Sequence, residues 1–346
     1  MRVVLFLAPV ARRRASDLRI ARYLWPAKRL VAIMVLSASC LLPKVPAQTA
    51  ARQDSVRLVD LMPGFWKFWT DAGSKPPPEQ AQAWQSFYVQ PNAAVFRDLD
   101  VPCARHFNTA SLETDYFPMV PQLASGMREL EASLPLTISQ TRRQFQQNFP
   151  DMAWRGDIYL MASAGCFNGR SQKVDGSEAL LLGLDNISYG LKETNLPALL
   201  EHELFHRYHH LYFEFEPQRD EPMWVRLWAE GMATYAARKL SPTATNMATM
   251  WMTDKKLADL DANQAQLAAA FLSRFDSTDQ ADADRYFLDD VSSDPNIPGH
   301  TGYYLGLRVA ELLSQRYTMT VMAHWNRAQA MPQIRDALQH MANSRP

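Results

Sequence analysis

Four of the eight histidines of this 346-residue chain lie between positions 202 and 210, in a segment with the pattern of a helix. Pro197 suits the first turn of a helix, and Thr194 or Asn195 can cap its N-terminus. Apolar side chains repeat along the segment at helical spacing, which predicts that one face is buried in a core. These predicted anchors are Leu200, Leu204, Tyr208, Leu211 and Tyr212.

The opposite face of this helix carries an H-E-x-x-H motif, formed by His202, Glu203 and His206. Helical residues four apart share a face and are separated by about 6 Å along the axis. Two imidazoles at that spacing can bind one Zn²⁺, each at about 2.1 Å. Glu203 neighbours the first ligand and can reach a water on the metal, as a general base must. The alternative is a solvated, charged helix face without a metal.

A second helical segment, residues 224–235, contains a candidate third ligand, Glu230. Glu230 follows His206 by 24 positions, which leaves room for a turn around residues 217–222 and an antiparallel return. Two histidines and one glutamate leave a fourth position for water, as in catalytic zinc sites. Apolar neighbours argue against a surface carboxylate here: Leu227, Trp228, Met232 and Ala233.

The two motifs together, H-E-x-x-H followed by W-x-E-G-x-A-x-Y, resemble the gluzincin metallopeptidases. Within that class the chain is most similar to poorly characterised predicted zinc proteases with a helix-rich single domain. The motifs cover about 40 residues, and about 150 residues fit the same plan. The resemblance implies zinc ligands at His202, His206 and Glu230. It also implies that Glu203 is the general base and acid, acting on a peptide or protein substrate.

Two further positions are interpreted through this resemblance. Several gluzincins have an Asp four residues after the ligand Glu, whereas this chain has Thr234, so the group that orients the histidines is left open. Related enzymes carry a Tyr three residues before a Gly, and Tyr303 matches that spacing. Tyr303 would then donate to the oxyanion, with Tyr304 and His300 as alternatives. A tyrosine simply packed at a helix start is the competing interpretation.

The remaining histidines of the helix are not expected to bind the metal. His210 would lie about 12 Å from His202 on a straight helix, too far for one ion. Metzincins place a Gly after the second histidine, and Arg207 stands there instead. His209 and His210 are therefore expected to line the cleft or to face solvent.

Residues 1–47 are predicted to be a secretory signal peptide. A basic stretch precedes an apolar run at 30–42, which is too short to span a bilayer, and cleavage is expected after Ala47. Alternatives are a twin-arginine signal at Arg13 and Arg14, lipidation at Cys40, an uncleaved anchor, and a later start codon. The protein is expected to be periplasmic or secreted, and to contact a membrane only if Cys40 is lipidated.

Charge and cysteines agree with export of an acidic protein. Residues 1–47 hold nine basic residues and one acid, so the remainder has 27 basic against 35 acidic residues. Its net charge of −8 argues against nucleic acid as a partner. Cleavage leaves Cys103 and Cys166, which could form a disulfide or remain two buried thiols.

The expected fold class is α+β and mostly α: one zincin-like domain over residues 48–346. Helices are expected at 56–71 and 79–96, and two more between 116 and 149, divided near Pro135. Strands at 158–161 and 179–184 are expected to pair antiparallel across a polar loop at 165–176. The chain is expected to be helical from about 197 to 345.

These observations predict an exported zinc-dependent peptidase. A metal-activated water would attack the peptide bond, with Glu203 as the base, and the strand at 179–184 would hold the substrate by main-chain pairing. A catalytically inactive binding protein on the same fold is one alternative, although the intact Glu203 speaks against it. A zinc hydrolase of a non-peptide amide is the other. Specificity, exo- or endopeptidase action and oligomeric state are not predicted.

Overall fold

The computed structural model describes residues 56–99, 103–153, 156–190, 195–215, 220–288 and 297–344. The predicted signal peptide with its cleavage site, the alternative at Cys40 and the capping candidate Thr194 fall outside the described residues. Residues 51–346 cluster into one compact unit. Within the described segments, every helix is either too short or too polar to serve as a membrane span.

The first part of the unit is helical apart from one short strand. The predicted helix at 56–71 begins later, because residues 58–60 pair in parallel with residues 158–160. Trp84 and Tyr88 are completely buried and pack edge to face, 4.7 Å between ring centroids, as expected for a core stripe. The elements are β1 (Leu58–Asp60), α1 (Met62–Ala72), α2 (Pro77–Trp84), η1 (Gln85–Val89), η2 (Gln90–Asn92), α3 (Ala93–Arg97), α4 (Ala104–Phe107), α5 (Thr109–Ser111), η3 (Leu112–Tyr116) and η4 (Phe117–Met119).

A single long helix, α6 (Val120–Asn148), replaces the two helices expected on either side of Pro135. A proline inside a helix removes one hydrogen bond and costs about 3 kcal/mol. Pro135 itself is exposed, whereas the apolar stripe that includes Leu130, Leu134, Ile138 and Phe145 stays buried through it. Continuous burial of this stripe offsets the cost of the proline.

The sheet has four strands in the order β1-β2-β4-β3. β2 (Asp157–Met161) and β4 (Ser177–Gly183) pair in parallel, so the expected antiparallel pairing of these two strands is wrong. The segment between them is not only a loop, because β3 (Gly169–Val174) pairs antiparallel with β4. Asp175 and Gly176 both have positive φ, which is the geometry of a two-residue hairpin turn.

This topology changes which strand could hold a substrate. β4 lies between two partners, and Leu180, Leu181 and Leu182 have no exposed surface. The free edge on this side of the sheet belongs to β3. The prediction that residues 179–184 offer an edge to a substrate is therefore wrong, since both edges of that strand are already paired.

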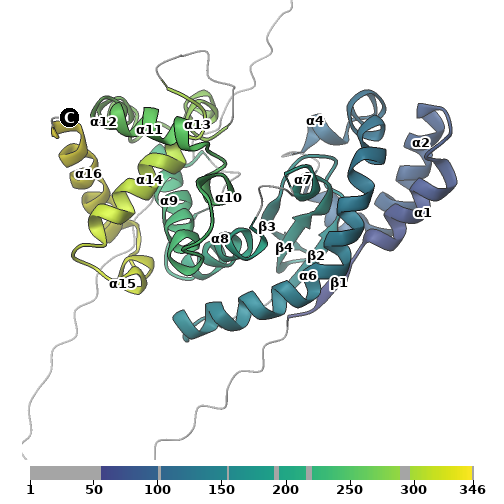
Figure 1. Cartoon of the computed structure of the whole chain (residues 1–346), viewed down its shortest axis with the longest axis horizontal. Coiled ribbons are helices and arrows are strands. Elements are labelled where there is room, and N and C mark those ends of the chain that lie inside the picture. Colours follow the sequence, from purple (N-terminus) through teal and green to yellow (C-terminus); the bar gives the residue numbers. More distant parts are fainter. Residues whose placement is uncertain are drawn as a thin grey trace, which may run out of the picture. The chain divides into compact units, whose positions relative to one another are not determined.

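Helices make up the described chain after the sheet, as predicted. The protein is thus mostly α with a small mixed sheet, and in Figure 1 α8 lies between the sheet and α9. The helices are α7 (Leu184–Tyr189), α8 (Leu196–His209), α9 (Met223–Leu240), α10 (Asn246–Met250), α11 (Asp254–Ala262), α12 (Gln264–Leu272), α13 (Gln280–Phe287), α14 (Thr301–Leu313), α15 (Met319–Ala323) and α16 (Arg327–Asn343).

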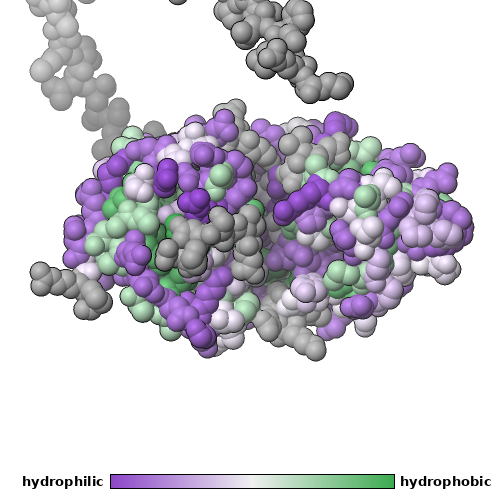
Figure 2. All heavy atoms as spheres, turned by 90° about the horizontal axis from the view of Figure 1, so that it is seen from above, coloured by the Kyte–Doolittle hydropathy of each residue, from purple (hydrophilic) through white to green (hydrophobic). Residues whose placement is uncertain are grey.

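A disulfide joins Cys103 to Cys166, with the two Cα atoms 5.8 Å apart. It ties the residue before α4 to the loop that leads into β3. Of the two possibilities left open by the sequence, the paired one is therefore found. On the face seen in Figure 2, hydrophilic residues predominate and apolar residues form separate patches.

Candidate metal centre

Helix α8 is held in place by its cap and by one apolar face. The Asn195 side chain accepts a hydrogen bond from the backbone N–H of Ala198, so Asn195 is the cap. Leu200, Leu204 and Tyr208 are buried, as predicted. The helix ends at His209, so Leu211 lies beyond it and is 54% exposed; its expected role as an anchor is wrong.

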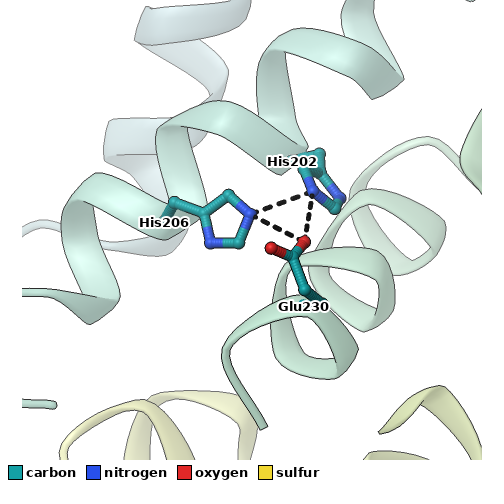
Figure 3. A group of neighbouring side chains, drawn as sticks. All are labelled: His202, His206 and Glu230. Atoms are coloured by element: carbon teal, nitrogen blue, oxygen red, sulfur yellow. Dashed lines mark hydrogen bonds and ion pairs between the residues drawn. The ribbon is translucent and has the colours of Figure 1, made fainter. Parts of the chain in front are cut away.

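Helix α9 packs against α8 and carries Glu230. The four apolar neighbours named from the sequence are all essentially inaccessible to solvent: Leu227, Trp228, Met232 and Ala233. They fix α9 in the core and leave Glu230 directed at α8, where it meets the two histidines (Figure 3).

Three side-chain atoms converge between these helices (Figure 3). Glu230 Oε2 lies 3.4 Å from His202 Nε2 and 3.2 Å from His206 Nε2. The two Nε2 atoms are 3.0 Å apart. The group is the candidate metal site found among the described residues. The predicted ligands therefore meet at one point, although Glu230 is 24 residues beyond His206 in the chain.

The spacing of these atoms fits a small metal ion. Ligand atoms at tetrahedral corners, each about 2.0–2.1 Å from a zinc ion, are about 3.3 Å from one another. The three observed separations scatter around that value. Burial opposes ionisation of Glu230, yet its pKa is held well below its usual range, chiefly by His206 and also by His202. An ionised carboxylate beside two imidazoles is a suitable ligand set for a divalent cation, whose identity the geometry does not distinguish.

Glu203 lies beside the three converging residues but is not one of them. Glu203 is 8% exposed, and no described residue forms a hydrogen bond with its side chain. Burial raises the pKa of Glu203, while His202 and His206 oppose the rise. A Cβ built on Gly169 of β3 would be 2.4 Å from Glu203 Cδ, so the carboxylate occupies the space that any other residue at 169 would need.

Tyr303 joins the site from α14, whereas Tyr304 does not. The Tyr303 ring lies 6.5 Å from that of His202, and the Trp251 ring lies 5.9 Å from His202 and 5.8 Å from Tyr303. Burial raises the pKa of Tyr303 well above its usual value, as do the carboxylates of Glu230 and Glu203. Tyr304 is fully buried, and its hydroxyl donates to Asp261 instead.

A contact between two glycines brings Tyr303 to the site. A Cβ on Gly306 would lie 2.4 Å from the carbonyl oxygen of Leu227 and 2.7 Å from Gly231 Cα. The backbones of α14 and α9 therefore touch at this point, next to Glu230. Tyr303 is almost one turn before Gly306, so the close crossing of the helices directs it toward Glu230 and His202.

The other residues named from the sequence have different surroundings. His209 is buried and stacks on Phe213, and burial lowers its pKa to about 3, with the charges of His206 and His210 adding to this effect. His210 is exposed. Thr234 is buried, but no described residue is hydrogen bonded to its Oγ1 or to His202 Nδ1. Thr234 thus does not orient His202 by a hydrogen bond.

The converging residues open into a cavity of about 1510 Å³. Typical sites for small molecules measure about 300–1000 Å³, so this cavity has room for an extended ligand. β3 and α8 form one side of it. The segment from α9 to α14 contributes three aromatic residues to the lining, Trp251, Phe287 and Tyr303, together with smaller apolar ones.

Three residues at the site were missed in the sequence. Gly169 and Arg170 stand in a segment that reads as a loop, although the Asp175-Gly176 pair is a strong hairpin signal that predicts strands on both sides. Trp251 has a left-handed backbone conformation with φ of 54° and follows a short helix. No local pattern distinguishes it from the other core aromatics.

Comparisons of the chain with known protein families, with curated proteins and with solved structures find no match.

Proposed function

We propose that this chain is a zinc-dependent peptidase of the gluzincin type with a zincin-like catalytic domain. The observation that carries the proposal is the convergence of His202, His206 and Glu230 at 3.0–3.4 Å, with Glu203 beside them and outside the ligand set. A buried acid adjacent to a three-ligand site is the arrangement that hydrolysis by an activated water requires. The export signal expected at 1–47 makes the protein periplasmic or secreted.

Each residue has a distinct role in this proposal. His202 and His206, through Nε2, and Glu230, through Oε2, hold the metal. Zinc bound there would lower the pKa of a water and polarise the carbonyl of the cleaved bond. A carboxylate oxygen of Glu203 takes a proton from the attacking water and passes it to the leaving nitrogen. The Tyr303 hydroxyl donates a hydrogen bond to the carbonyl oxygen as that atom gains negative charge.

The cavity supports a peptide substrate over a small amide. Its volume of about 1510 Å³ suits several residues of an extended chain. β3 presents an unpaired strand edge in the sheet and lines this cavity, and a peptide can bind a strand edge by main-chain hydrogen bonds. The role of substrate platform, first expected of residues 179–184, is therefore proposed for Gly169–Val174.

Metal analysis combined with digestion of a peptide library tests the proposal. The purified protein should contain about one zinc per chain and should cleave peptides. Glu203→Gln should retain zinc, because Glu203 is not a ligand, and should lose activity by about 10²- to 10⁴-fold, mainly in kcat. Tyr303→Phe should lose less, because the nucleophile and the base both remain.

The same experiment separates the alternatives. A protein that binds zinc and peptides but cleaves neither peptides nor other amides would be the inactive binding protein. Cleavage restricted to non-peptide amides would identify the other hydrolase class. A Glu203→Gln variant that retains zinc and cleaves at the wild-type rate would end the proposed mechanism.

A further inference from the structure

The lysines and arginines that line the cavity are unevenly distributed along the chain. Of the described lining residues, four are lysine or arginine, and all four come from the part of the chain up to α8. The lining contributed by α9 to α14 contains no lysine or arginine and is mostly apolar or aromatic. The basic residues are Arg97, Arg170, Lys173 and Arg207.

Arg170 differs from the other three cations in being partly buried without an ion pair of its own. Arg97 lies 3.6 Å from Asp175, Arg207 lies 3.9 Å from Glu178, and Lys173 is exposed to water. Arg170 forms no ion pair with any residue that the structure describes, and its Nε is buried without a hydrogen-bond partner. Burial lowers the pKa of Arg170, and the negative charge of Glu203 opposes this effect.

A buried N–H donor without a hydrogen-bond partner, such as the Nε of Arg170, is unfavourable. The cost is relieved when an anion enters the same space. Arginine presents a planar fork of N–H donors that matches the two oxygens of a carboxylate. A cavity lined by such an arginine therefore favours ligands that bring a carboxylate with them.

The place of Arg170 in the fold sets where that carboxylate would be. Arg170 follows Gly169, whose backbone lies against the Glu203 carboxylate. It also lies on β3, the edge strand proposed to bind the peptide backbone. Arg170 and Glu203 both line the cavity, and the Glu203 carboxylate is close enough to act on the Arg170 charge, so a group bound by Arg170 belongs to the bond being cleaved or to a residue close to it.

We propose that Arg170 determines specificity by binding a carboxylate of the peptide, so that this enzyme prefers substrates with an acidic group near the cleaved bond. The inference rests on the proposed peptidase function. The carboxylate could be an Asp or Glu side chain or the free C-terminus of the peptide. Both have the same chemistry, and the test distinguishes between them.

The test uses matched peptides and three variants. In the first peptide set both ends are blocked by acetylation and amidation, and a single Glu occupies a different position in each peptide. The second set, the neutral twin, has Gln in place of that Glu. A third set has Gln and a free C-terminal carboxylate. The variants are Arg170→Gln, Arg170→Lys and the control Lys75→Gln, which removes a positive charge from an exposed residue that does not line the cavity.

The wild type should cleave the best Glu peptide, or the free-acid peptide, with a kcat/KM at least 10-fold above that of its neutral twin. Arg170→Gln should lower kcat/KM for the acidic peptide by about 10- to 100-fold and leave the neutral peptide nearly unchanged. Arg170→Lys should recover part of the preference, and Lys75→Gln should retain it. An equal loss on acidic and neutral peptides would show that Arg170 acts through Glu203 and would overturn the proposal.

Binding provides a readout that does not depend on hydrolysis. The Kd of each peptide for the metal-depleted protein is measured by calorimetry, with and without Arg170→Gln. Tighter binding of the acidic peptide that disappears in Arg170→Gln supports the inference even if no peptide is cleaved, in which case the peptidase proposal alone fails. Equal Kd values for acidic and neutral peptides in the wild-type protein would overturn the inference itself.

Discussion

The backbone of Gly169 lies directly against the carboxylate of Glu203: a Cβ on Gly169 would be 2.4 Å from Cδ and 2.5 Å from Oε1 of that side chain. This relationship links the edge strand β3 to helix α8. The strand thereby limits where the carboxylate of the proposed base can lie, and only glycine leaves enough space for it.

Gly169→Ala is expected to displace the Glu203 carboxylate while leaving the metal ligands in place. A misplacement of about 1 Å in a catalytic group can lower the rate about 10²-fold. We therefore expect kcat to fall by about 10- to 100-fold with zinc content unchanged, measured by steady-state kinetics and atomic absorption. Ser177→Ala, at the exposed start of β4 and outside the cavity, is the control and should have little effect. Wild-type turnover in Gly169→Ala would contradict the contact.

Removal of any one ligand is expected to abolish stable metal binding. His202→Ala, His206→Ala and Glu230→Ala should each lower zinc content sharply from about one per chain. His210→Ala should not, because His210 is exposed and lies outside the converging group. Chelation of the metal should lower Tm, since a ligand that binds only the folded state stabilises it. Loss of zinc from His210→Ala alone would overturn the ligand set.

Gly306→Ala is expected to separate α14 from α9. The new Cβ would lie 2.4 Å from the carbonyl oxygen of Leu227 and 2.7 Å from Gly231 Cα, which are backbone atoms that cannot turn aside. Overpacking of this kind costs about 1–3 kcal/mol in the free energy of unfolding, measurable by urea denaturation. Tyr303 should move with α14, so turnover should fall as well. Unchanged stability would be inconsistent with the helix crossing.

Reduction of the Cys103–Cys166 disulfide is expected to destabilise the fold. The two cysteines are 63 positions apart. A crosslink that closes a loop of this size lowers the conformational entropy of the unfolded chain, which raises the free energy of unfolding by about 4 kcal/mol. The Tm should fall in reducing buffer, and the double variant Cys103→Ala, Cys166→Ala should show the same fall without a reductant. Both thiols should react with an alkylating agent only after reduction. Reactive thiols in the untreated protein would contradict the pairing.

The proposed ligands could be found from the sequence because the signals are local. Helical periodicity brings His202 and His206 to one face, whatever the rest of the fold. Glu230 was found by its apolar neighbours, which predict a buried helix with one carboxylate. The cap at Asn195 is also a short-range pattern. The Asp175-Gly176 turn is equally local, and with it the strand at Gly169–Val174 could have been predicted.

The remaining features of the site depend on contacts between residues far apart in the chain. Neighbouring tyrosines 303 and 304 have the same local sequence, and only the crossing of α14 over α9 decides that Tyr303 reaches the site. β4 became an inner strand because residues 58–60 and 157–161 complete the sheet on its other side.

The sequence by itself therefore determined the helix of the site, the candidate metal ligands and the candidate base, because periodicity and capping act within a few residues. Only the tertiary structure decided the strand order, the continuity of α6 through Pro135 and the contact of Gly169 with Glu203. These features depend on the burial of surfaces contributed by distant segments, and burial can override local preference when enough apolar area is removed from water.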